Sequence, residues 1–126
     1  MKFLVQQQPA YVYTGGKAFE ATKPSVVFIH GAANDHSVWT LQARYFAHHG
    51  WNALAVDLPG HGRSFGVAKP SVAQYSDWLV NLLDNGAITN AVLVGHSMGS
   101  LIALDCAARH PKRVSKLALL GSSAPM

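Results

Sequence analysis

The segment Gly95-His96-Ser97-Met98-Gly99 holds a serine with a glycine two residues away on either side. It follows the apolar run Ala91 to Val94 and precedes a run of small and apolar residues that begins at Ser100. In a sharp turn from a strand into a helix, a serine hydroxyl stands at the carboxyl end of the sheet, and the backbone is so crowded that only glycine fits at these flanking positions. The bare pattern is also typical of a tight turn with a capping serine. The strand and helix around it favour the other interpretation, a nucleophilic Ser97.

A nucleophilic serine needs hydrogen-bond donors for the negative charge that develops on the substrate oxygen. The backbone N–H of Met98 would lie at the N-terminus of the following helix, where N–H groups are free and the helix dipole is positive. A second donor has to come from a nearby loop. The turn Gly31-Ala32-Ala33 has small residues that let the backbone approach a substrate, and we expect the N–H of Ala32 to be this donor.

Apolar, β-rich runs alternate with helical patterns along the chain, which is typical of an α/β domain. The patterns predict a predominantly parallel sheet of about six strands with three helices, in which the first two strands form an antiparallel edge. The expected strands span residues 3–5, 10–13, 25–30, 53–58, 91–94 and 116–120, and the expected helices span residues 36–49, 71–85 and 100–109.

Two helix details follow from the residue spacing. Ser71 and Gln74 form a capping-box pattern at the start of the second helix. For the first helix, with Asp35 or Ser37 as its N-cap, we expect an apolar face of four large residues: Val38, Leu41, Tyr45 and Phe46.

The amino-acid composition excludes some classes of protein and disfavours others. The chain has 126 residues, the size of one domain, and 49% of them are hydrophobic while 13% are charged, against roughly 25% charged in an average soluble domain. This excludes intrinsic disorder. The net charge of +4 comes from few acids rather than many bases, so a nucleic-acid partner is not favoured. The single Cys106 favours a cytoplasmic location, and without a long apolar run we expect no membrane partner.

The sequence predicts neither a metal nor a cofactor. The seven histidines show no metal-binding spacing such as His-Glu-x-x-His. Gly60, Gly62 and Gly66 depart from the dinucleotide pattern G-x-G-x-x-G, so we interpret them as part of a turn braced by Asp57 and Arg63. We expect His30 and His96 to be packing residues.

Three motifs resemble the α/β-hydrolase family: His30-Gly31-Ala32-Ala33 followed by Trp39, residues 57–64 (Asp-Leu-Pro-Gly-His-Gly-Arg-Ser), and residues 95–99. The resemblance covers nearly the whole chain. It implies that Ser97 attacks an ester-like carbonyl of a small-molecule substrate and forms an acyl-enzyme, with the Met98 and Ala32 amides as the oxyanion hole. A serine at this position argues against the branches with an aspartate nucleophile, such as haloalkane dehalogenases and epoxide hydrolases.

The serine also requires a base and an orienting acid, which follow it in this family. Downstream of Ser97 the only candidates are Asp105 and His110, and a rise of ~1.5 Å per residue would place them roughly 12 Å and 20 Å away along the helix. Neither can reach the serine. An upstream histidine such as His36 is a less favoured alternative. We therefore expect residues 1–126 to be the amino-terminal portion of a hydrolase domain that lacks the C-terminal strands, lid and helices, and to have no appreciable turnover alone.

Three helices also leave one face of a six-stranded sheet covered only by the helix at 36–49. We expect a complementary C-terminal half or a homo-oligomer to cover the exposed sheet.

Other functions stay open. The same turn serves acyl transfer, thioester or C–C bond hydrolysis and peroxidation, and the chain could also be a non-catalytic half that works only by pairing with another chain.

Overall fold

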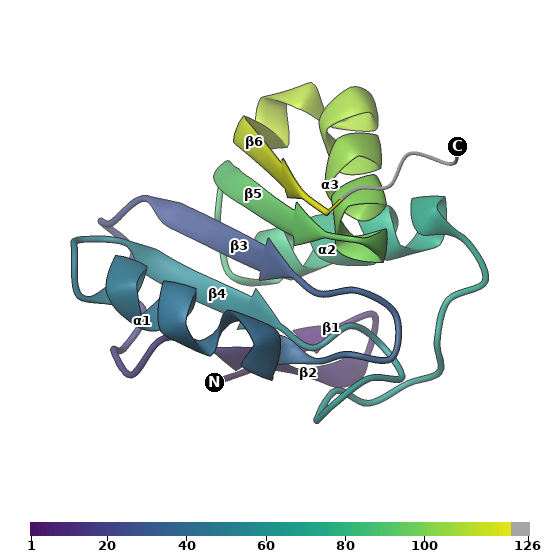
Figure 1. Ribbon diagram of the computed structural model, residues 1–126, viewed down its shortest axis with the longest axis horizontal. Helices are drawn as coiled ribbons and strands as arrows, with labels where there is room; N and C mark the ends of the chain where they lie inside the picture. Colours follow the sequence, from purple (N-terminus) through teal and green to yellow (C-terminus); the bar gives the residue numbers. More distant parts are fainter. Residues whose placement is uncertain (122–126) are drawn as a thin grey trace.

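The computed structural model describes residues 1–121 as a six-stranded sheet with helices on both faces (Figure 1). Along the sheet the strands lie in the order β1-β2-β4-β3-β5-β6. Their bounds are β1 Lys2–Val5, β2 Gln8–Tyr13, β3 Ser25–Ile29, β4 Asn52–Val56, β5 Ala91–His96 and β6 Val114–Leu120. The pairs β1–β2 and β2–β4 are antiparallel, and the pairs β4–β3, β3–β5 and β5–β6 are parallel. The predicted α/β architecture is confirmed.

The helices are distributed unequally over the sheet. Helix α1 (Thr40–Ala47), which follows the 3-10 turn η1 (His36–Trp39), lies on one face, and α2 (Val72–Asn85) and α3 (Met98–Arg109) lie on the other (Figure 1). The short 3-10 turn η2 (Pro111–Arg113) leads from α3 into β6. Within residues 1–121, none of the helices combines the length and apolar character needed to cross a bilayer.

The central strands β3 and β4 are buried on both faces, as their continuous apolar sequences predict. Val27 and Leu54 pack into the core that α2 and α3 share, whereas Phe28 and Ala55 pack into the smaller core beneath α1. Because side chains alternate across a strand, each central strand contributes to both cores. These two strands therefore form the rigid platform from which the loops at their carboxyl ends start.

Helix α2 begins with the predicted cap. The Ser71 side chain accepts a hydrogen bond from the Gln74 N–H at 3.2 Å. One face of the helix is buried against the sheet, and it includes Trp78 and Leu82.

The apolar face expected for the first helix is wrong for Val38, Leu41 and Tyr45, which are exposed, whereas Phe46 is half-buried and packs on the core beneath α1 as expected. Trp39, Ala43 and Ala47 are the buried residues, whereas Leu41 and Tyr45 are 79% and 60% exposed. The reason is close packing by small residues: a Cβ at Gly15, in the loop after β2, would lie only 2.4 Å from the Ala43 carbonyl oxygen. Large side chains on that stripe would push the helix away from the sheet. The pattern of large apolar residues therefore pointed to a face that the molecule leaves exposed.

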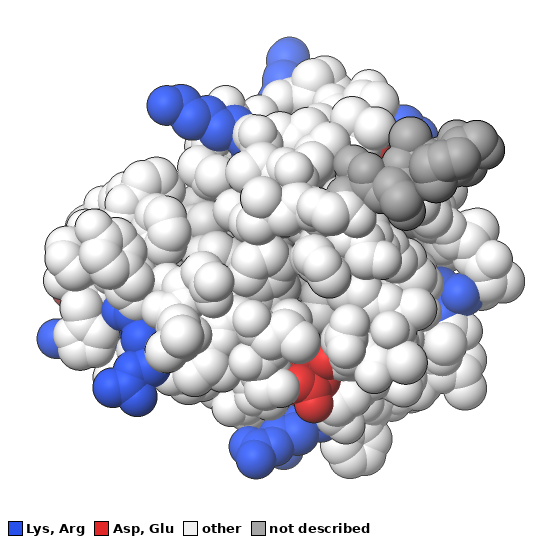
Figure 2. Space-filling model, viewed as in Figure 1, with Lys and Arg blue, Asp and Glu red and all other residues white. Residues whose placement is uncertain are grey.

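On the α1 side, no helix of residues 1–121 covers β5 and β6 (Figure 1). Strand β6 pairs with β5 alone among the described strands, and its Ala118 and Leu120, which lie on this face, are exposed, Leu120 by 49%. Figure 2 shows that this face carries few charged side chains and that most of them lie near its outline. An apolar sheet face and a free strand edge of this kind favour association with further protein.

Candidate active site

Ser97 forms the sharp turn between the end of β5 and the start of α3. Its φ of 57° and ψ of −121° lie outside the regions that non-glycine residues ordinarily occupy, and its side chain is exposed. Backbone strain of this kind costs on the order of 1–3 kcal/mol and persists only where the surrounding structure imposes it. The strained, exposed serine has the geometry that the sequence pattern predicts.

The two glycines of the segment are required by close backbone contacts. A Cβ at Gly95 would lie 2.2 Å from the Gly99 carbonyl oxygen, and a Cβ at Gly99 would lie 2.1 Å from the carbonyl oxygen of Ile29. Real Cβ atoms essentially never come within 3.0 Å of other heavy atoms. The turn is thus pressed against the end of β3, and this contact lifts Ser97 out of the sheet.

The turn after β3 borders the serine. A Cβ at Gly31 would lie 3.1 Å from the Cβ of Ser97, and the N–H of Asn34 donates to the Gly31 carbonyl at 3.2 Å to close the turn. Ala32 is exposed. Met98 is the first residue of α3, so its N–H has no partner within the helix. Both predicted donors thus belong to backbone beside Ser97: Met98 follows it directly, and Ala32 follows Gly31, which borders its Cβ.

His30, at the end of β3, is fully buried and hydrogen-bonded through both ring nitrogens. Its Nδ1 donates to the Gly31 carbonyl at 2.7 Å, and its Nε2 accepts from the Leu58 N–H at 3.1 Å. These partners assign a neutral ring with the proton on Nδ1. Burial lowers the pKa of His30, which agrees with this neutral state. The ring is thus buried and hydrogen-bonded inside the core, as expected for His30.

Asp57 and His36 form a pair that the sequence analysis missed. The unexposed Asp57 carboxylate accepts from the His36 N–H at 2.7 Å, from the His36 ring at 2.9 Å, and from the Arg63 N–H at 2.8 Å. The bracing of the turn by Asp57 and Arg63 is confirmed. No local spacing links residues 21 positions apart, but both follow neighbouring parallel strands, whose carboxyl ends meet at one edge of the sheet.

Asp35, His36 and Asp57 bring three potential metal ligands within 4.8 Å of one another. Their ligand atoms already have partners within the chain. The Asp35 carboxylate accepts from the Ser37 N–H and hydroxyl at 2.8 Å and 2.6 Å, which lowers the pKa of Asp35. We assign no ion to this cluster.

A hollow of about 260 Å³ opens beside Ser97. It is lined by Val38, Trp39, Gln42, His96 and Leu120. The Ser97 N–H donates to the Leu120 carbonyl at 3.2 Å, so the end of β6 borders both the serine and the hollow. Trp39 is buried, whereas His96 is exposed and lines the hollow, which differs from the packing role that we expected for His96.

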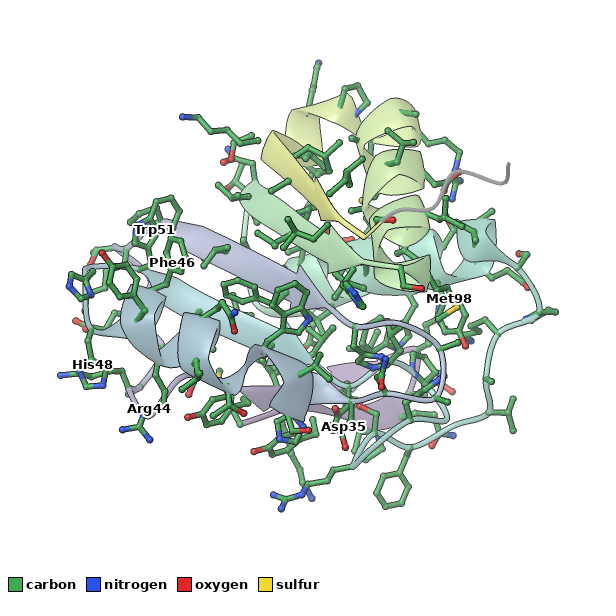
Figure 3. All side chains as sticks on the ribbon, viewed as in Figure 1. Asp35, Arg44, Phe46, His48, Trp51 and Met98 are labelled. Atoms are coloured by element: carbon green, nitrogen blue, oxygen red, sulfur yellow. The ribbon has the colours of Figure 1, made fainter. Side chains whose placement is uncertain are left out.

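Ser97, the turn after β3 and the hollow all lie at one end of the sheet, where the parallel strands have their carboxyl ends. Figure 3 shows Met98 and Asp35 toward the carboxyl ends of the strands, whereas Trp51 and His48 lie toward the opposite end. Asp105 and His110, further along α3, are engaged elsewhere: Asp105 pairs with Arg109 at 2.9 Å, and His110 lies 3.8 Å from Asp77. Within residues 1–121 no hydrogen bond joins a histidine ring to Ser97.

Replacing Gly99 by alanine tests the close contact at the turn. In an unobstructed helix this change would stabilise by roughly 0.5–1 kcal/mol. Here we expect G99A to destabilise by about 1–3 kcal/mol, because the new methyl group would overlap the Ile29 carbonyl. Urea unfolding measures the difference. A stabilised G99A chain would contradict the described turn.

The lowered pKa of His30 makes stability depend on pH. The unfolded chain takes up a proton at His30 near its ordinary pKa of 6.5, whereas the folded chain resists it. The free energy of unfolding therefore falls as the pH drops below about 6.5, by about 1.4 kcal/mol for each unit by which folding lowers this pKa. Urea midpoints between about pH 8 and pH 5 measure this loss. It should be smaller in H30Q, and an equal loss in both chains would count against the buried neutral ring.

Comparison with known proteins places this geometry in a family. The sequence profile of the alpha/beta hydrolase fold matches residues 24–126. Pimeloyl-[acyl-carrier protein] methyl ester esterase from Neisseria meningitidis is 40% identical over 100 residues, which cover 79% of this chain and 36% of that protein. The (E)-2-((N-methylformamido)methylene)succinate hydrolase of Acinetobacter baylyi is 33% identical over 96 residues, which cover 75% of this chain and 36% of that protein.

The fold comparison agrees. The crystal structure of a membrane phospholipase A described as a bacterial virulence factor superposes with a TM-score of 0.89 and 30% identity, over 100% of this chain and 40% of that chain. The chain thus spans well under half the length of these relatives. By sequence and by fold, this chain belongs to the α/β-hydrolase family.

Proposed function

We propose that the chain carries the nucleophile of a serine hydrolase that acts on an ester-like carbonyl of a small molecule. The observation that carries this proposal is the exposed Ser97, held at a φ of 57° between two glycines that close contacts require. The relative from Neisseria meningitidis, a methyl ester esterase, supports the ester-like substrate class.

In the proposed reaction the Oγ of Ser97 attacks the substrate carbonyl carbon and its proton passes to a base. The carbonyl π-bond pair moves onto the oxygen, and the N–H groups of Met98 and Ala32 stabilise that negative charge. When the tetrahedral intermediate collapses, the alcohol leaves with a proton from the base and an acyl-enzyme remains. Water then attacks the acyl group in the same way, releasing the carboxylic acid and restoring Ser97.

We propose that the base and its orienting acid come from residues outside 1–121 or from another chain. Two observations support this view: both ring nitrogens of His30 are occupied, and within residues 1–121 no hydrogen bond joins the His36 ring, whose Nδ1 is held by Asp57, to Ser97. The greater length of the relatives supports it as well. Without a base, the chain alone would keep only binding and oxyanion effects and have no appreciable turnover.

A non-catalytic half that works by pairing with another chain is the second candidate, and the uncovered face of β5 and β6 favours it. Acyl transfer, thioester or C–C bond hydrolysis and peroxidation would use the same Ser97 turn. We also propose a cytoplasmic location, which the single Cys106 supports, because one cysteine cannot form an internal disulfide and disulfides are typical of exported domains.

A fluorophosphonate probe separates the enzyme from the binding module. We expect slow labelling of the chain at Ser97, abolished in S97A and unchanged in S115A, which removes an exposed serine on β6. Mass spectrometry of the digested protein locates the label. No labelling at Ser97, even in a longer chain that supplies the acid and histidine, would favour the binding role.

The uncovered face predicts association. We propose that a complementary C-terminal segment or a second copy covers β5 and β6, so the chain alone should exceed its monomer mass of 13.5 kDa as its concentration rises. Sedimentation velocity measures this. Placing a charge on the face with L120K should weaken association at least several-fold, whereas L104K, at an exposed leucine of α3, should not. A monomer at every concentration contradicts the prediction.

A further inference from the structure

The peptide group between Gly31 and Ala32 links the interior of the protein to the proposed oxyanion hole. Its carbonyl oxygen accepts a hydrogen bond from the Nδ1 of His30 at 2.7 Å, and its N–H is the one that we assign to the oxyanion. We propose that His30 is a positioning residue that aims the Ala32 N–H at the oxyanion by holding this peptide plane. The inference rests on the function proposed above and adds a residue to its machinery.

The direction of the N–H follows from peptide geometry. A trans peptide group is planar, and its C=O and N–H point in opposite directions. Because the carbonyl points toward a fully buried ring, the N–H points away from the interior, on the side where Ala32 is exposed. Gly31 lies against the Cβ of Ser97, so this N–H belongs to a peptide group bordering the serine. A rotation of the plane that broke the His30 bond would turn the donor away.

The ring itself is fixed from the other side. The N–H of Leu58, two residues beyond the end of β4, donates to Nε2 at 3.1 Å, which keeps the proton on Nδ1, where the Gly31 carbonyl needs it. His30 therefore transmits the position of one strand end to the loop after the neighbouring strand. A hydrogen bond to the carbonyl also polarises the peptide group and strengthens its N–H as a donor.

Filling space would not require a histidine here. An apolar side chain could fill this volume without the cost of burying two polar nitrogens, and His30 recovers that cost only through its two hydrogen bonds. The N–H of Asn34 reaches the same carbonyl, but at 3.2 Å and from an exposed turn residue. The buried ring is the more rigid of the two supports.

Two substitutions test the hydrogen bonds of the two His30 ring nitrogens separately. The amide nitrogen of asparagine takes the place of Nδ1, so H30N keeps a donor for the Gly31 carbonyl and loses the contact with Leu58. Glutamine reaches to the Nε2 position, so H30Q keeps a partner for Leu58 and loses the donor. H61N is the matched control, because His61 lies 5.1 Å from the His30 ring and bonds the Pro59 carbonyl instead.

The readout is the amide NMR spectrum of each chain before and after fluorophosphonate labelling of Ser97. In the unchanged chain, in H61N and in H30N, we expect the amide protons of both Met98 and Ala32 to move downfield, because the phosphoryl oxygen accepts from both. In H30Q we expect the displacement of Ala32 to fall by half or more while that of Met98 remains. A purely packing role would predict no difference between H30N and H30Q.

Several outcomes would overturn the inference. An undiminished Ala32 displacement in H30Q would show that His30 does not hold the donor. A Met98 displacement without one at Ala32 in the unchanged chain would remove Ala32 from the oxyanion hole and leave Ser97 as the nucleophile. Absence of labelling at Ser97, both in this chain and in a longer chain that supplies the acid and histidine, would end the proposed function and this inference together. If a variant fails to fold, the ¹⁵N chemical shifts of the His30 ring in the unchanged chain show which ring nitrogen carries the proton. A proton on Nε2 contradicts the inference.

Discussion

The contact between the turn at Ser97 and the end of β3 is the constraint on which the rest of the structure depends. Gly99 lies so close to the Ile29 carbonyl that no side chain fits between them, and a Cβ at Gly31 would make a tight contact, at 3.1 Å, with the Cβ of Ser97. Two parallel neighbours, β3 and β5, are thereby locked together at their carboxyl ends. The strain at Ser97 persists because this packing leaves the backbone no relaxed alternative.

The strand beside them completes the support. Residues just beyond β4 hold both ends of the loop after β3: Leu58 through the His30 ring, and the Asp57 carboxylate through His36. The Leu58 link is buried, and the Asp57 link is partly buried and made by a charged carboxylate, so both are stronger than exposed loop contacts. Positioning thus comes from the platform of β3, β4 and β5, while α1 and α2 serve mainly to cover it.

Local patterns in the sequence predicted the features that depend on near neighbours. The strand runs, the Ser71 cap and the strained Ser97 are each defined within a few residues, and the structure contains them. The predicted face of α1 was wrong because the helix packs closely against Gly15, and only small residues such as alanine fit in that contact. The larger apolar residues of the helix therefore lie mostly outside it. The pair of His36 and Asp57 could not be found locally, because only the sheet order brings those residues together.

The central claim is that Ser97 is a reactive hydroxyl beside two amides that await negative charge. A crystal structure of the chain after treatment with an organophosphonate tests it most directly. We expect a covalent bond from the Ser97 Oγ to phosphorus, with the phosphoryl oxygen about 2.7–3.1 Å from the nitrogens of Met98 and Ala32. An adduct on another residue, or a phosphoryl oxygen turned away from both amides, would contradict it.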